Sequence, residues 1–213
     1  MPRLVLLEPS YSTIADVYTL EELKAAGNNP RITEINLLSS ISDINEEIDI
    51  MNGVMFNGNG NTLTFTSTGR NLIFFKDSDI KNLTVVSNGT DNWTSTYTTQ
   101  LFNGKYTVSD CNFEGGNGGL LVLSADVTLD GTVNVSNNTF GGIEVSKGSG
   151  EGLNGSTLTI KGTILNSTED TEKPTAWIDG VNDGNSIVGG NLYSNDTKKD
   201  DQILYYLEEV NAQ

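Results

Sequence analysis

Residues 127–135 read Val127-Thr128-Leu129-Asp130-Gly131-Thr132-Val133-Asn134-Val135. Apolar and polar side chains alternate along this stretch, which is the pattern of a β-strand with one buried face. We expect the apolar side chains to pack on strands above and below, and the polar ones to face water. The inward-facing residues are then Val127, Leu129, Val133 and Val135, and the outward-facing ones are Thr128, Asp130, Thr132 and Asn134.

Similar short strands recur along the chain at intervals of about 20 to 30 residues, which is the period of a solenoid. Gly, Asn and Asp mark the turns between them. The copies are Ile80-x-x-Leu83-x-Val85, Val108-x-x-Cys111-x-Phe113, Val127-x-Leu129-x-Gly131-x-Val133, Leu158-x-Ile160-x-Gly162-x-Ile164, and Ile187 to Leu192. Earlier strands are expected at Ile32 to Leu38, Ile44 to Ile50, Asn61 to Phe65 and Leu72 to Phe75.

This arrangement of strands restricts the fold class. Several short strands per repeat, without intervening helices, exclude a doubly wound sheet, and the uneven spacing argues against a propeller. We therefore expect an all-β chain of stacked coils that forms a parallel β-helix. A β-sandwich also has alternating strands and polar turns, and it is the alternative that remains.

Helical signals flank the strands at both ends. Thr19-Leu20-Glu21-Glu22 matches a capping box, which predicts a short capping helix at residues 19–26. Near the other end, an acidic start at Asp200-Asp201 precedes apolar residues at helical spacing, so we expect a second short helix there. The predicted organisation is an N-terminal arm at residues 1–18, a β-helix at 19–199 and a C-terminal helical segment at 200–213.

Composition excludes several classes of partner and cofactor. The chain has 28 acidic and 12 basic residues, no histidine and a formal charge of -16, so nucleic acid is a poor partner. The single Cys111 excludes an internal disulfide, and without a CxxC pair or a histidine cluster we expect no metal and no cofactor. The apolar run Leu4-Val5-Leu6-Leu7 is too short for a membrane span or a signal peptide.

Two segments resemble a known family. They are Tyr18-Thr19-Leu20-Glu21-Glu22-Leu23-Lys24-Ala25-Ala26 running into Ile32-Thr33-Glu34-Ile35-Asn36-Leu37, and Val127-Thr128-Leu129 leading to Asn137-Asn138-Thr139-Phe140-Gly141-Gly142-Ile143-Glu144-Val145. The chain is similar in pattern to pectate-lyase-like adhesive domains of the pectin-lyase-like superfamily, over about residues 18–193. Phage tailspikes and capsid-surface proteins look similar in the same way. The resemblance implies a right-handed parallel β-helix with a surface or adhesive role, and neither segment is a reaction signature.

The residues that catalysis would need are scarce. A pectate lyase needs an arginine in its groove, and only Arg3, Arg31 and Arg70 are present, each at a position unsuited to that role. Asp77 and Asp79 form a local carboxylate pair, but they flank a turn, where Asp is favoured for its backbone hydrogen bonds. Residues 179–184 offer oxygen ligands without the spacing of a calcium loop. We therefore expect a protein that is not an enzyme.

Aromatic residues mark the expected binding site. Trp93 and Tyr97 lie in a polar stretch at residues 88–97 that is longer than a tight turn needs, so we expect a projecting loop whose rings bind a carbohydrate or a partner. Trp177 has apolar neighbours and is expected to pack into a late coil.

The leading functional hypothesis is a non-catalytic bacteriophage virion component, such as a capsid decoration, fibre or tail protein, on the virion surface or otherwise extracellular. In this interpretation Leu4, Val5, Leu6 and Leu7 dock the arm on a capsid or tail protein, and the β-helix projects outward and binds surface glycans. A homotrimer is compatible with this fold. The alternatives are a bacterial cell-surface adhesin domain and a polysaccharide lyase or glycoside hydrolase.

Overall fold

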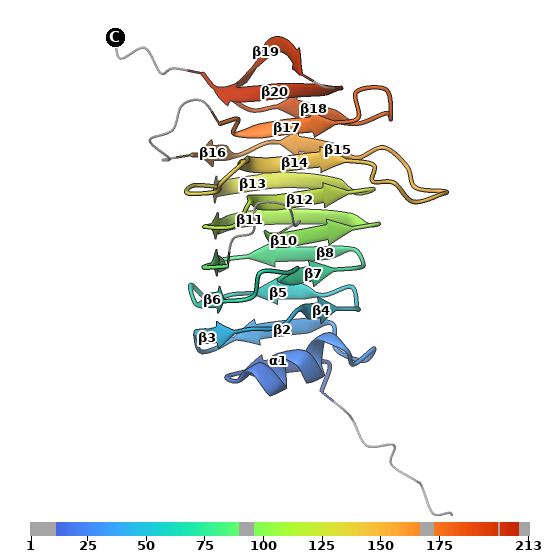
Figure 1. Ribbon diagram of the computed structural model, residues 1–213. Helices are drawn as coiled ribbons and strands as arrows, with labels where there is room; N and C mark the ends of the chain where they lie inside the picture. The colour runs from blue at the N-terminus through green and yellow to red at the C-terminus, as the bar shows by residue number, and fades with distance from the viewer. Residues whose placement is uncertain (1–11, 90–95, 167–172, 200, 209–213) are drawn as a thin grey trace, which may run out of the picture.

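Stacked β-coils make up the part of the chain that a computed structural model describes, which is residues 12–89, 96–166, 173–199 and 201–208. The coils rise from the helix α1 at one end to the strands β19 and β20 at the other (Figure 1). Neighbouring coils pair through parallel ladders, as between β11 and β13, and a β-sandwich would pair antiparallel strands instead. The expected parallel β-helix is confirmed.

The coils build two long sheets. Sheet A runs through β1 (Ile14–Val17), β2 (Glu34–Leu37), β5 (Met55–Asn57), β8 (Ser78–Lys81), β11 (Lys105–Glu114), β13 (Asp126–Asn134), β15 (Thr157–Ile160) and β18 (Ser186–Gly189). Around a corner it continues into β3 (Ile41–Ile44), β6 (Thr62–Phe65), β9 (Thr84–Ser87) and β16 (Thr163–Leu165). Sheet B comprises β4 (Ile48–Ile50), β7 (Leu72–Phe74), β10 (Tyr97–Phe102), β12 (Gly118–Leu123), β14 (Gly141–Ser146), β17 (Ala176–Asp179), β20 (Gln202–Leu207) and β19 (Leu192–Lys199).

The corner within sheet A depends on residues that tolerate a left-handed backbone. Asn82, Asp110 and Gly131 occupy it in successive coils, with φ of 52°, 52° and 60°. Asn, Asp and Gly adopt this conformation at the lowest cost. The Asp110 side chain also accepts a hydrogen bond from the Thr132 amide of the next coil at 3.0 Å, so it links one corner to the next.

Apolar side chains fill the interior between the sheets. The alternation expected around Gly131 is confirmed, because Val127, Leu129, Val133 and Val135 are at most 1% exposed. Phenylalanines occupy the largest fully buried positions, and the Phe56 and Phe74 rings meet edge to face with centroids 5.7 Å apart. The core is one continuous column, as expected when each coil packs on its neighbours.

Helix α1 (Leu20–Gly27) covers the N-terminal end of this column, as expected. The Thr19 hydroxyl accepts from the Glu22 amide, and the Glu22 carboxylate accepts from the Tyr18 and Thr19 amides. The hydrogen bond from the Tyr18 amide is the main reason that the pKa of Glu22 is lowered. Leu23 and Ala26 are buried against the first coil, and the Gly27 carbonyl accepts from the Met51 amide beside β4.

The predicted C-terminal helix is wrong. Residues 202–207 form strand β20, which pairs antiparallel with β17 and with β19. Ile203, Tyr205 and Leu207 alternate along this strand and pack against the core, so period two replaces the helical spacing. A short apolar segment is compatible with the helical period of 3.6 residues and with the strand period of two. Pairing with the edge of β17 favours the strand.

Two boundaries also differ from those expected. Residues 14–17, which were assigned to the arm, form β1 and pair with β2, so the β-helix begins before α1. The strand expected from Ile44 to Ile50 is two strands, β3 and β4, which lie in different sheets. The polar residues between them form a corner, where the chain passes from one sheet to the other.

Candidate functional site

The outer face of sheet A carries a continuous row of side chains, one from each coil. Each of these residues pairs with the next one across neighbouring strands. The side chains of paired residues point to the same face of the sheet, so they form a row across the coils. We call this set the outer row: Ile14, Glu34, Met55, Asp79, Thr107, Thr128, Thr159 and Val188.

A hollow of about 290 Å³ lies on this face beside the outer row. Residues Thr33, Gly53, Val54, Met55, Asp77, Ser78, Asp79 and Lys105 line it. The side chain of Met55 is 41% exposed, and Asp77, Asp79 and Lys105 are also exposed. The hollow therefore offers two carboxylates, one ammonium group and one apolar surface to a ligand.

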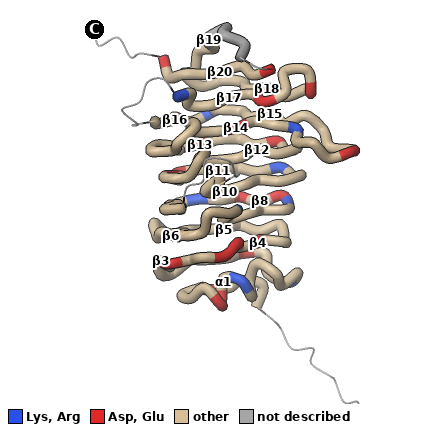
Figure 2. Tube along the Cα trace, in the orientation of Figure 1, with Lys and Arg blue, Asp and Glu red and all other residues tan. Residues whose placement is uncertain are grey.

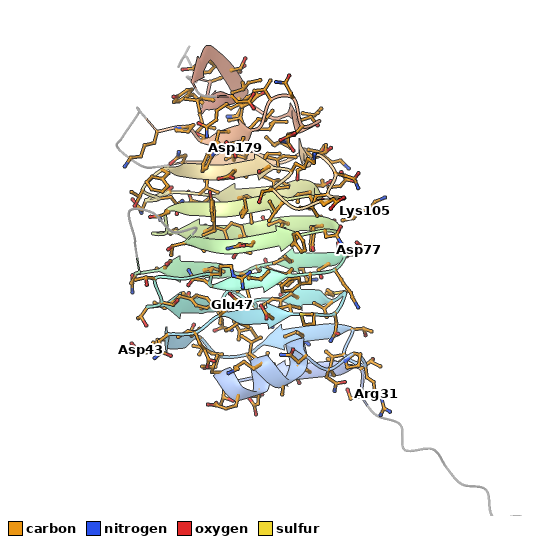
Figure 3. All side chains as sticks on the ribbon, turned by 45° about the vertical axis from the view of Figure 1, so that its right-hand side comes forward. Arg31, Asp43, Glu47, Asp77, Lys105 and Asp179 are labelled. Carbon is orange, nitrogen blue, oxygen red and sulfur yellow. The ribbon has the colours of Figure 1, made fainter. Side chains whose placement is uncertain are left out.

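Backbone contacts position the acidic wall of the hollow. Asp77 accepts a hydrogen bond from the Lys105 amide at 2.8 Å, and both residues lie at the same edge of the stack (Figure 3). The Ser78 hydroxyl accepts from the Val54 amide at 3.2 Å and donates to the Lys76 carbonyl at 2.9 Å. These contacts join three successive coils, so the hollow has a rigid frame.

Gly53, at the edge of the hollow, lets its coil lie close against the backbone of the next coil. A side chain on Gly53 would begin 2.8 Å from the Asp77 carbonyl oxygen, which is closer than real contacts allow. Tyr106, which follows Lys105 in β11, has its hydroxyl oxygen 2.7 Å from the Phe102 carbonyl oxygen and 3.0 Å from the Phe74 carbonyl oxygen, and its single proton is shared between these two acceptors. Burial, followed by the nearby Asp77 charge, raises the pKa of Tyr106, so this tyrosine stays neutral and acts as a structural support.

The Asp77 and Asp79 pair is only partly what the sequence predicted. Asp77 lies in the turn before β8 and accepts a backbone hydrogen bond, as expected of a turn residue. Asp79 belongs to β8 and points outward into the hollow. Lys105 was not predicted as a site residue. The alignment of the repeats did match Val108 with Ile80, and these two residues pair in the structure. Lys105 lies three residues before Val108, and Asp77 lies three residues before Ile80. The aligned repeats therefore already indicated that Lys105 and Asp77 are neighbours.

The expectation that Tyr97 stands on a projecting loop is wrong. Tyr97 is the first residue of β10, is 6% exposed, and its hydroxyl donates to the Glu144 carboxylate. Its ring lies over Gly118, where a side chain would come within 2.3 Å of the ring. The glycine on the neighbouring strand therefore makes the slot that buries the tyrosine. Trp93 and residues 4–7, the other predicted binding residues, lie outside the described residues.

A second polar group lies on the outer face of sheet B. Glu144 pairs across the ladder with Trp177, which is 6% exposed and packs with Tyr97 and Leu121. Trp177 thus packs in a late coil, as expected. Asp179 follows on the same face and accepts from the Gln202 amide group at 2.9 Å. Burial raises the pKa of Glu144 to about 7, the Tyr97 hydrogen bond opposes this, and Asp179 adds to it.

Glu144 makes stability depend on pH near neutrality. Its ordinary pKa is 4.5 and its folded pKa is about 7, so the folded state binds the extra proton between these values. The stability that this proton contributes is present at low pH and is lost as the pH rises through 7. Glu47, whose pKa burial also raises, acts in the same direction. We expect a higher unfolding temperature at pH 6 than at pH 8, and a smaller difference in Glu144→Gln.

Thermal unfolding followed by circular dichroism at the two pH values measures this difference. The exposed Glu151→Gln is the matched control, and it should keep the wild-type difference. An unchanged difference in Glu144→Gln would show that other groups cause the pH dependence.

Metal-binding groups, membrane spans and charge distribution can be followed over the residues that the structure describes. In the described ranges, no group of three acidic, cysteine or histidine side chains is arranged to hold a metal ion. The helix within those ranges is neither long enough nor apolar enough to cross a membrane. Figure 2 shows basic positions scattered along the stack among acidic ones. Arg70, considered as a lyase residue, forms an ion pair with Glu47 at 2.7 Å.

No protein-family model, curated protein or solved structure matches this chain. The resemblance to pectate-lyase-like adhesive domains therefore stays a hypothesis. The parallel strand pairing is the evidence for the fold.

Proposed function

We propose that this protein is a non-catalytic adhesive module that binds glycans in the hollow on sheet A. One observation carries the proposal: Met55, Asp79 and Lys105 all line one open depression on the outer face of sheet A. Carboxylate and ammonium groups hydrogen-bond sugar hydroxyls, and charged hydrogen bonds are the strong ones. The Met55 side chain supplies an apolar surface against which the carbon face of a sugar ring packs.

The charge of the site selects the class of glycan. Asp77 and Asp79 line the hollow together with a single Lys105, and the whole chain carries a formal charge of -16. Like charges repel, so sugars that carry carboxylates or sulfates are disfavoured here. The proposed ligands are neutral or amine-bearing oligosaccharides.

Asp79→Ala is expected to weaken glycan binding roughly 10- to 100-fold, because a hydrogen bond to a charged group is lost. Calorimetric titration with neutral, amine-bearing and uronate-bearing oligosaccharides measures this. Thr159→Ala is the matched control, since Thr159 lies in the same outer row two strands beyond Thr107 and does not line the hollow. Equal affinities of Asp79→Ala and wild type would refute the site.

A non-catalytic role predicts that the bound oligosaccharide is recovered intact. Mass spectrometry of the sugar after prolonged incubation tests this, and cleavage products would make the protein an enzyme. In that case the second candidate function is glycosidic hydrolysis by Glu144 and Asp179. This reaction needs a carboxyl group with a raised pKa beside a second carboxylate, and the pKa of Glu144 is raised. Glu144→Gln should then abolish the cleavage.

The proposed setting is the surface of a bacteriophage virion, where an elongated stack would present its faces to a host. Mass spectrometry of virions purified from the source material tests this placement. We expect the chain at a stoichiometric copy number. Its absence from virions would favour the bacterial adhesin, which uses the same glycan site.

A further inference from the structure

A groove of about 250 Å³ lies at the N-terminal end of the stack, between strand β1 and helix α1. Its apolar lining is Ala15, Val17, Ala25, Ala26 and Ile32. Helix α1 closes the stack at this end (Figure 1). The groove shares no lining residue with the hollow on sheet A, so the two are separate sites.

The groove exists because α1 packs most closely on the other sheet. A side chain on Gly27 would begin 2.6 Å from the Asp49 carbonyl oxygen of β4, so the helix backbone lies directly against sheet B. Toward β1 the helix presents only the short side chains of Ala25 and Ala26, and Ala25 is exposed. The space between these alanines and β1 is the groove.

Strand β1 borders the groove with a backbone edge that is open at one residue. The Leu38 amide donates to the Val17 carbonyl at 2.8 Å. In a parallel pair, alternate residues direct their backbone groups to the partner strand, so the groups of Ile14 and Asp16 point away from β2. The Ser12 hydroxyl bonds both backbone groups of Ile14, at 2.9 and 3.2 Å. The Asp16 amide and carbonyl have no such partner among the described residues.

Acidic side chains surround this open edge. Glu22 lines the groove, and the Asn36 amide group donates to both the Asp16 and the Glu34 carboxylates, at 3.2 and 3.1 Å. None of these three carboxylates forms an ion pair within the described part of the chain. A cation that a partner brings to this edge therefore meets unopposed negative charge.

We propose that the groove and the β1 edge bind an extended segment of a partner protein in which apolar and basic residues alternate. The segment adds to β1 as one more strand of sheet A, and the Asp16 amide and carbonyl form backbone hydrogen bonds with it. Its apolar side chains point inward, as Ala15 and Val17 do, and enter the groove. Its basic side chains point outward and lie beside Asp16.

Charge argues against a second copy of this chain as the occupant. The chain carries a formal charge of -16 and only 12 basic residues, so two copies repel each other. A basic partner is attracted instead. The contact attaches the molecule by its N-terminal end, and it uses no residue of the hollow on sheet A.

Short end-capped peptides serve as probes, and fluorescence anisotropy measures their binding to the full-length protein. One peptide alternates valine with lysine, and a second alternates valine with glutamate. Ala25→Leu fills the groove from an exposed helical position, where leucine is a good helix former. Ala25→Ser is the matched control, because it keeps a small side chain. Circular dichroism checks the fold of both variants.

Wild type and Ala25→Ser are expected to bind the lysine peptide, whereas Ala25→Leu should bind it at least about 10-fold more weakly. The glutamate peptide should not bind. Two N-methylated forms of the lysine peptide test the backbone contact. Methylation of the valine amides and methylation of the lysine amides should differ, with only one of them abolishing binding, because alternate amides of a strand face the same edge.

Failure of the lysine peptide to bind wild type would overturn the proposal. So would equal binding by wild type and Ala25→Leu. Equal affinities of the two N-methylated peptides would also contradict it, because they would show attraction by charge without strand addition. Self-association of wild type that Ala25→Leu abolishes would assign the groove to a second copy of the chain instead of a basic partner.

Discussion

Phe113→Ala is expected to lower the free energy of unfolding by about 3–5 kcal/mol, the usual cost of removing a fully buried aromatic ring. Phe113 is 0% exposed, and its strand pairs with β9 on one side and β13 on the other. Coils fixed by parallel ladders cannot move together to fill the space, so the substitution leaves a cavity. Urea unfolding followed by circular dichroism measures the loss.

The control for this substitution keeps the strand and removes an outward side chain. Thr128→Ala lies on the outer face of β13, and it should change the free energy of unfolding by no more than about 0.5 kcal/mol. If Phe113→Ala costs less than Thr128→Ala, Phe113 is not a core residue and the assigned register is wrong.

Gly162→Ala is expected to cost about 1–3 kcal/mol, because the new methyl group has no space. An added side chain would begin 2.0 Å from the Gly131 carbonyl oxygen and 2.7 Å from its nitrogen. These are backbone atoms of the previous coil, so relief requires two stacked corners to separate. The unfolding free energy in urea again measures the effect.

Gly69→Ala is the matched control. Gly69 is exposed, and an added side chain would meet only the Ser67 hydroxyl oxygen at 3.5 Å, an ordinary contact. Alanine there restricts the unfolded chain, so stability should stay equal or rise by up to about 1 kcal/mol. Equal effects of the two substitutions would show that the corners at Gly131 and Gly162 are not stacked closely.

The repeat made most of the fold predictable. Matching Leu158 with Val127, and Ile187 with Leu158, reproduces pairs that the structure contains. Gly131 and Gly162 occupy matching positions of the repeat because their corners touch. The close contact leaves no room for a side chain, so glycine recurs at this position. The capping box was equally predictable, since Thr19 and Glu22 interact only with nearby backbone.

The errors arose where a distant segment decides the structure. Residues 202–207 become a strand because β17 offers them an edge, and nothing within the segment distinguishes this from a helix. Tyr97 is buried because Gly118, from the next coil, leaves room for its ring. Lys105 joins Asp77 through the register of two coils, so only a full alignment of the repeat would have brought these residues together.

The central claim is that the hollow on sheet A binds a glycan, and a crystal structure with an oligosaccharide that binds in solution tests it most directly. We predict an intact sugar in the hollow, in contact with Met55, Asp79 and Lys105. A sugar bound beside Glu144 and Trp177 on sheet B, or a cleaved product at either place, would contradict the account.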